Sequence, residues 1–240
     1  MPLEFKKVKN GQLTISYAIQ RHGEGPNLVI LPGALATKWD YTGFDEFFSK
    51  DDNKALGTVI SLDFRGRGES ELPEDEKVKI GFSVDDHLSD VAAVIDEVGL
   101  NSFYIVGHSF GAALGLKYAI NNRDKVLGLI VGDYVPFCPP FDSNWKEKIE
   151  KRVGQFNIHP DLPSLLKDGF KPEGFVHQLS EIDGLPLLII KGQFLSNDKA
   201  MKMWSAMRNT QVFDGPKDHD VYSSDQTRKR VLNFCGASLA

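Results

Sequence analysis

The pentapeptide Gly107-His108-Ser109-Phe110-Gly111 lies between an apolar run at 103–106 and a helical stretch of small residues at 112–119. A G-x-S-x-G sequence in this context bends a strand sharply into a helix and holds its serine in a strained conformation with the hydroxyl exposed. The two glycines are expected because a larger side chain would collide at the tight turn. A serine that merely caps a helix needs no flanking glycines. We therefore predict that Ser109 is a nucleophile.

The composition is that of an ordinary globular protein, with 41% hydrophobic and 25% charged residues among 240. This length suits one α/β domain, which we expect to span residues 1–240. A net charge of -5 without a long basic run argues against nucleic acid as a partner. The sequence has no signal-like amino terminus and no apolar run of membrane-spanning length. Its two cysteines, Cys138 and Cys235, fit neither a disulfide framework nor a metal site, so we expect a cytoplasmic protein with no metal.

The strand pattern changes along the chain. A segment with period two at 13–19 predicts a strand that is antiparallel to a first strand near 5–9. Short, nearly continuous apolar runs follow, which are typical of strands covered on both faces; they lie at 28–31, 58–62, 103–106, 126–131 and 185–190. Helical patterns alternate with these runs, at 44–48, 83–98, 112–120 and 196–207. The alternation predicts an α/β fold with a mostly parallel central sheet and helices on both faces.

The alternation breaks between about residues 135 and 182, where the sequence contains no clear buried strand. Proline-rich sequence leads there into amphipathic pieces. Loops of this length without structure of their own are uncommon in compact domains. We therefore predict a short helical cap inserted after the sixth strand.

The order of these elements resembles that of the α/β-hydrolase fold superfamily. Three motifs carry the resemblance, which covers essentially the whole chain: Leu31-Pro32-Gly33-Ala34, the segment from Asp63 to Ser70, and the elbow at Ser109. These motifs are specific for the fold and much less so for the substrate. In similar proteins the segment from Asp63 to Ser70 buttresses the active-site loops, so we expect Asp63 and Arg65 to be ion-pair partners there, with no catalytic role.

A serine hydroxyl becomes a good nucleophile when a base takes its proton. The candidate base is His219, which follows a short strand-like segment at 210–213 and precedes the terminal helix, where the resemblance places the family's histidine. The resemblance also implies that the backbone N–H groups of Ala34 and Phe110 form an oxyanion hole.

The acid departs from the usual family pattern. Family members commonly read Gly-x-x-Asp after the seventh strand, but this spacing from Gly192 falls on Leu195, which cannot accept a hydrogen bond. Two replacements are available, Asp133 directly after the sixth strand and Asp198 three residues beyond Leu195. We favour Asp133 because a carboxylate at the carboxyl end of a strand points toward the site. Asp198, which can be explained as an acid in the first turn of a helix, stays as the alternative.

Aromatic residues in the loops and the cap suggest a largely apolar pocket near Ser109. They are Trp39, Phe110, Phe137, Phe141, Trp145 and Phe194. The first expectation is a serine hydrolase that cleaves a carboxylic ester or thioester of a small to medium, largely apolar substrate through an acyl-enzyme, without a cofactor.

Two other hypotheses about the function are also consistent with the sequence. Carbon–carbon bond hydrolases and lyases share this fold and triad, and the short cap and small size also resemble a menaquinone-pathway lyase of the family. Such a lyase would want cationic cap residues for an acidic substrate, and Lys146 or Arg152 could supply them. Some members of the fold are non-catalytic ligand-binding proteins, which is the third reading. The sequence leaves the oligomeric state open.

Overall fold

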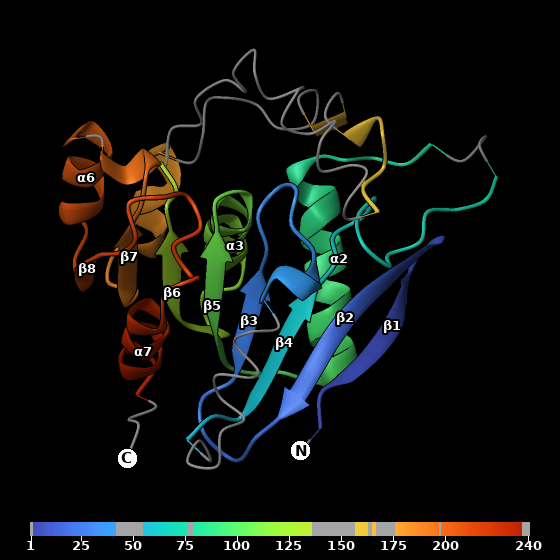
Figure 1. The fold of residues 1–240 in the computed structure, drawn as a ribbon, viewed down its shortest axis with the longest axis horizontal. Helices are drawn as coiled ribbons and strands as arrows, with labels where there is room; N and C mark the ends of the chain where they lie inside the picture. The colour runs from blue at the N-terminus through green and yellow to red at the C-terminus, as the bar shows by residue number, and fades with distance from the viewer. Residues whose placement is uncertain are drawn as a thin grey trace.

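A computed structural model of the chain describes residues 2–41, 55–75, 79–135, 157–162, 165–166, 176–196 and 198–236. Its centre is an eight-stranded sheet in the order β1-β2-β4-β3-β5-β6-β7-β8 (Figure 1). The strands are β1 (Glu4–Asn10), β2 (Leu13–Arg21), β3 (Leu28–Leu31), β4 (Thr58–Leu62), β5 (Phe103–His108), β6 (Val126–Gly132), β7 (Leu187–Lys191) and β8 (Thr210–Asp214). β2 pairs antiparallel with β1 and β4, and every later pair is parallel. The predicted fold class is confirmed.

The sheet is covered on both faces, as its continuous apolar strands predict. In β3, Val29 and Leu31 point into a core shared with the helices α2 (Val84–Val98), α3 (Phe110–Asn121) and α6 (Asp198–Ser205). Their neighbours Leu28 and Ile30 point into a second core shared with α7 (Asp225–Phe234). Figure 1 shows α2 and α3 on one side of the sheet and α7 on the other. The helix predicted at 44–48 lies outside the described residues.

Helix α2 begins where the sequence predicts, because Ser83 caps it. The Ser83 hydroxyl accepts a hydrogen bond from the backbone N–H of Asp86, and the Asp86 carboxylate accepts one from the N–H of Ser83. This capping box satisfies two backbone donors at once. Gly99 ends the helix in the left-handed conformation, with φ of 75°.

The insertion between β6 and β7 is described at 157–162, 165–166 and 176–182, the last being the 3-10 helix η2 (Val176–Ile182). Figure 1 shows the pieces at 157–162 and 165–166 above the carboxyl ends of the strands. The backbone N–H of His159 donates to the carbonyl of Gly66 at 2.8 Å, and Ile158 and Leu162 are buried. This part of the insertion therefore packs on the turn that follows β4.

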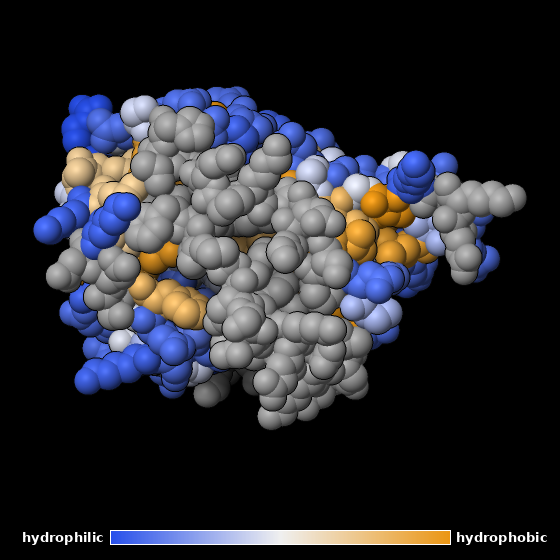
Figure 2. All heavy atoms as spheres, turned by 90° about the horizontal axis from the view of Figure 1, so that it is seen from above, coloured by the Kyte–Doolittle hydropathy of each residue, from blue (hydrophilic) through white to orange (hydrophobic). Residues whose placement is uncertain are grey.

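Seen from above the carboxyl edge, the described surface is hydrophilic along much of its margin, and hydrophobic residues gather in separate patches (Figure 2). Phe194 and Trp39 are among the large hydrophobic side chains that remain exposed, at 48% and 46%. None of the described helices combines the length and the apolar character that crossing a membrane requires.

Candidate active site

Ser109 forms a strained elbow between β5 and α3. Its φ of 51° and ψ of -114° lie outside the regions that non-glycine residues ordinarily adopt. The Ser109 N–H donates to the carbonyl of Gly132 in β6 at 2.9 Å, which continues the pairing of β5 with β6. The Ser109 side chain makes no capping hydrogen bond to α3. The conformation is therefore that of a nucleophile elbow rather than of a capping serine.

The two glycines of the elbow are required by close backbone contacts. A methyl group at Gly111 would lie 2.0 Å from the carbonyl oxygen of Leu31, and one at Gly107 would lie 2.5 Å from Cα of Ala112. Backbone atoms cannot move aside as the end of a flexible side chain can. The start of α3 therefore packs directly against the carboxyl end of β3, and this contact brings the loop after Leu31 beside Ser109.

Asp133 follows β6 directly and, like Ser109, has a positive φ, here 44°. Its carboxylate is fully buried, and Oδ2 lies 2.7 Å from Nδ1 of His219. A carboxylate accepts hydrogen bonds, so Nδ1 carries the hydrogen in this contact. The other ring nitrogen, Nε2, is then left as the one that can accept a proton.

The loop after β7 holds the Asp133 carboxylate. Oδ1 accepts hydrogen bonds from the backbone N–H groups of Gly192 at 3.1 Å, Phe194 at 2.9 Å and Leu195 at 2.9 Å. Leu195 occupies the position where the family pattern has its acid, and its side chain is buried. The loop that carries the acid in other members thus supplies the donors here. Asp198 is the first residue of α6, and its side chain lies outside the described part of the chain.

His219 is packed between two other rings. Its ring centroid lies 4.5 Å from that of His108, the residue before Ser109, and 4.5 Å from that of Phe194. The Nε2 atom of His108 lies 2.6 Å from the backbone oxygen of His219, so it donates to that carbonyl. The elbow and the histidine loop are therefore held together next to Ser109.

Tyr222 fastens the histidine loop to the sheet. Its buried hydroxyl donates to the carbonyl of Gly107 at 3.0 Å, and its ring would lie 2.7 Å from a methyl group at Gly132. It therefore contacts β5 and β6 close to where Ser109 and Asp133 follow them. The contributions of Tyr222 and His108 were missed from the sequence, because no motif marks a residue that anchors a loop through backbone carbonyls.

The two residues expected to form an oxyanion hole lie on adjoining elements. Ala34 is in the turn after β3, and Phe110 is the first residue of α3. A methyl group at Gly33 would lie 3.1 Å from Nδ1 of His108, so this turn closes against the elbow. The first N–H groups of a helix point out of its amino-terminal end, which directs that of Phe110 toward the region beside Ser109.

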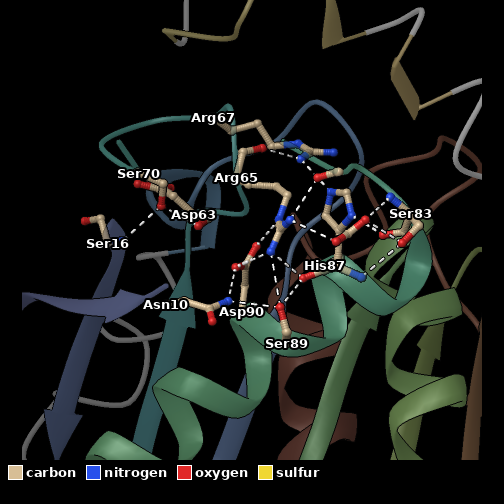
Figure 3. A network of polar contacts seen from close by, with 12 residues as sticks. Asn10, Ser16, Asp63, Arg65, Arg67, Ser70, Ser83, His87, Ser89 and Asp90 are labelled. Atoms are coloured by element: carbon tan, nitrogen blue, oxygen red, sulfur yellow. Dashed lines mark hydrogen bonds and ion pairs between the residues drawn. The ribbon is translucent and has the colours of Figure 1, made fainter. Parts of the chain in front are cut away.

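The segment from Asp63 to Ser70 buttresses these loops through two separate ion pairs, of which Figure 3 shows the one between Arg65 and Asp90. Asp63 pairs with Lys38 of the 3-10 helix η1 (Lys38–Tyr41), with 2.6 Å between Nζ and Oδ2. Arg65 makes a two-pronged contact with Asp90 of α2, at 2.7 and 2.8 Å. The prediction that Asp63 and Arg65 pair with each other is therefore wrong. Each reaches a different neighbouring helix, and that helix supplies a closer buried partner.

The structure brings one of the predicted pocket residues to His219. Phe194 packs on the His219 ring and is half exposed. The Trp39 ring packs on Phe5 of β1, with 4.6 Å between the ring centroids. Phe110 is buried against Phe64. The remaining candidates, Phe137, Phe141, Trp145, Lys146 and Arg152, lie outside the described residues.

Comparison with known proteins identifies the family. The model of the alpha/beta hydrolase fold family matches residues 26–229. The chain belongs to this family. Among described residues, no group of three or more His, Cys, Asp or Glu side chains is arranged to hold a metal ion.

Similar proteins within the family are named for different reactions. The chain is 28% identical over 151 residues to 2-hydroxymuconate semialdehyde hydrolase from Pseudomonas putida, covering 60% of this chain and 51% of that one. It is 28% identical over 140 residues to fluoroacetate dehalogenase from Burkholderia, covering 58% and 44%. These matches span about half the length of each relative or less. An α/β hydrolase from Novosphingobium aromaticivorans has a similar fold, with a TM-score of 0.76 at 16% identity over 98% of both chains.

Proposed function

We propose that the protein is a serine hydrolase that cleaves a carboxylic ester or thioester through an acyl-enzyme on Ser109. The observation that carries this proposal is the 2.7 Å contact between Asp133 and Nδ1 of His219, on a loop packed against the elbow of Ser109. A buried carboxylate in this position fixes the tautomer of the histidine and stabilises its protonated form. Membership of the hydrolase family supports the same reaction class.

The proposed reaction begins when Nε2 of His219 takes the proton of the Ser109 hydroxyl and Oγ attacks the substrate carbonyl carbon. The carbonyl oxygen becomes negatively charged, and the N–H groups of Ala34 and Phe110 donate to it. His219 then gives its proton to the departing alcohol or thiol as the bond to the carbonyl carbon breaks. In the second half, His219 takes a proton from water as the water oxygen attacks the acyl carbon. The bond from that carbon to Oγ then breaks, His219 returns the proton to Oγ, and the carboxylic acid leaves.

The surroundings of His219 favour a small to medium, largely apolar substrate. Phe194 presents a half-exposed ring next to the proposed base. Such an aromatic surface suits an apolar acyl or alcohol group. We expect the chain to act as one catalytic unit on a small-molecule substrate without a cofactor.

Carbon–carbon bond hydrolysis is the second candidate. The observation that favours it is the similarity to 2-hydroxymuconate semialdehyde hydrolase. The arrangement of Ser109, His219 and Asp133 suits either reaction, so activity assays with both kinds of substrate are needed to distinguish them.

Covalent labelling by a fluorophosphonate tests the nucleophile. We expect wild-type protein and a Ser102→Ala control, at an exposed serine, to be labelled, and Ser109→Ala to be inert. Absence of labelling in the wild type, or labelling that survives Ser109→Ala, would contradict the proposal. A panel of p-nitrophenyl esters, acyl thioesters and a vinylogous 1,5-diketone then separates ester or thioester cleavage from carbon–carbon cleavage.

A further inference from the structure

The side chain of Arg67 has no role in the reaction proposed above, yet it is fully buried in the turn after β4. Its Nε donates to the carbonyl of Ala34 at 2.8 Å, and its Nη1 donates to the carbonyl of Arg65 at 2.8 Å. Nη1 also lies 3.0 Å from Nε2 of His87 in α2, a contact that joins the turn to the helix (Figure 3). Nη2 is buried and has no hydrogen-bond partner within the described part of the chain.

His87 meets Arg67 as a neutral acceptor. The Nδ1 atom of His87 lies 2.8 Å from the carbonyl oxygen of Ser83, which can only accept, so Nδ1 carries the hydrogen. Nε2 is then left to accept from Arg67. Burial, and secondarily the charge of Arg67, hold the pKa of His87 well below its usual range. The histidine is therefore uncharged near pH 7.

Arg67 keeps its positive charge without a direct carboxylate partner in the described residues. Burial lowers the pKa of Arg67 to about 9, which leaves the guanidinium protonated at pH 7. The nearest carboxylates on this turn and on α2 are engaged elsewhere, since Asp63 pairs with Lys38 and Asp90 with Arg65. Arg67 therefore makes no direct ion pair with a described carboxylate, although the charges of Asp90 and Asp63 favour its protonated form. The more exposed carboxylates of Glu69 and Asp86 also pair with Lys38 and Arg65, respectively.

Arg67 contacts both of the residues whose N–H groups are proposed to form the oxyanion hole. Arg67 holds the carbonyl of Ala34, the residue whose N–H is one proposed donor. The centre of its guanidinium lies 5.5 Å from the ring centroid of Phe110, the residue that provides the other. In a buried region of low dielectric, a fixed positive charge favours negative charge nearby far more than it would in water.

We propose that Arg67 is a positioning residue that fixes Ala34 and keeps a positive charge, bonded only to neutral acceptors, behind the oxyanion hole. This role rests on the hydrolase activity proposed above and deepens it. The negative charge exists in the tetrahedral intermediate and not in the bound ester, so Arg67 stabilises the transition state over the ground state. His87 contributes to the same effect, because an uncharged acceptor binds the Arg67 guanidinium without neutralising its positive charge.

A matched pair of substitutions at His87 tests the charge. His87→Gln keeps a neutral acceptor, whereas His87→Glu places a carboxylate of nearly the same shape against Arg67. We expect kcat and the rate of fluorophosphonate labelling to fall by about 10-fold to 100-fold in His87→Glu relative to His87→Gln, with KM similar in the two. A purely structural Arg67 would gain an ion pair in His87→Glu, and its kcat would equal or exceed that of His87→Gln. That result would overturn the proposal.

Substitution of Arg67 itself gives an independent measurement. Arg67→Met removes the charge and the hydrogen bonds, and Arg67→Lys restores the charge. We expect kcat in Arg67→Met to fall by about 100-fold at little change in KM, with partial recovery in Arg67→Lys. A folded Arg67→Met with wild-type kcat would refute the role of Arg67. If Arg67→Met does not fold, the pair at His87 decides. A wild type that is not labelled at Ser109 would instead refute the hydrolase proposal.

Discussion

The backbone N–H of Leu195 donates to Oδ1 of Asp133 at 2.9 Å, although Leu195 stands where the family pattern has its acid. The neighbouring N–H groups of Gly192 and Phe194 donate to the same oxygen. A methyl group at Gly192 would lie 2.7 Å from Cγ of Asp133, so the loop can close on the carboxylate only with glycine there. The loop after β7 thus binds and positions the carboxylate of Asp133, the residue that follows the neighbouring strand β6.

Asp133→Asn is expected to lower turnover by up to about 10⁴, because the amide would donate to Nδ1 of His219 and favour the wrong tautomer. Steady-state kinetics with p-nitrophenyl acetate measure this loss. Asp198→Asn is the matched control, since it changes the other candidate acid by the same chemistry, and it should cost little. The opposite ranking of the two variants would assign the acid to Asp198.

Much of the fold could be predicted because its strands carry a clear pattern. The run at 28–31 is apolar at every position, and β3 occupies the same residues. The prediction for β5 ended at Val106, whereas the strand continues through Gly107 and His108. A glycine without a side chain gives no hydrophobic pattern to extend, so the sequence shows the turn but not the last paired residues.

The site was less accessible to sequence reasoning, because its contacts join distant residues through backbone groups. Asp133 and His219 stand 86 residues apart, and the N–H groups that hold Asp133 have no signature in the sequence. The pairing of Asp63 with Arg65 is expected from the resemblance to similar proteins, whereas the partner Lys38 comes from a separate 3-10 helix. Trp39 follows Lys38 directly, and its contact with Phe5 could not be foreseen without that pairing.

Gly111→Ala is expected to destabilise the protein by at least about 3 kcal/mol, because the added methyl group would overlap the backbone of Leu31. Labelling of Ser109 should fall with it, since α3 would have to move away from β3. Urea unfolding measures the loss of stability. Gly11→Ala is the control: it has a positive φ but no atom within 4 Å of the new methyl group, so about 1–2 kcal/mol is expected. Equal losses in the two variants would contradict the close packing at the elbow.

Asp90→Ala is expected to cost about 3–5 kcal/mol of unfolding free energy, because it removes the buried carboxylate that pairs with the guanidinium of Arg65 and leaves only the more distant, more exposed carboxylate of Asp86. Lys6→Ala removes an exposed ion pair with Glu4 and should have a much smaller effect. Chemical denaturation of both variants at neutral pH makes the comparison. A small effect of Asp90→Ala would mean that the turn from Asp63 to Ser70 does not depend on its anchor in α2.

His87 should make the protein lose stability as the pH falls below about 6.5, the usual pKa of histidine in an unfolded chain. Burial and the nearby charges of Arg67 and Arg65 hold the pKa of His87 well below that value in the folded state, while its hydrogen bond to Ser83 opposes this shift. The unfolded chain therefore binds a proton that the folded one does not. Stability should then fall by about 1.4 kcal/mol per pH unit from this residue alone.

Urea unfolding of wild type and His87→Gln at several values between pH 7.5 and 5 isolates this contribution. Glutamine does not titrate, so the difference in unfolding free energy between the two proteins should change with pH while effects of the carboxylates cancel. A difference that stays constant across this range would mean that His87 takes up its proton at the same pH in the folded and the unfolded protein. Below that pH, Nε2 of folded His87 would carry a hydrogen and could not accept the hydrogen bond from Arg67.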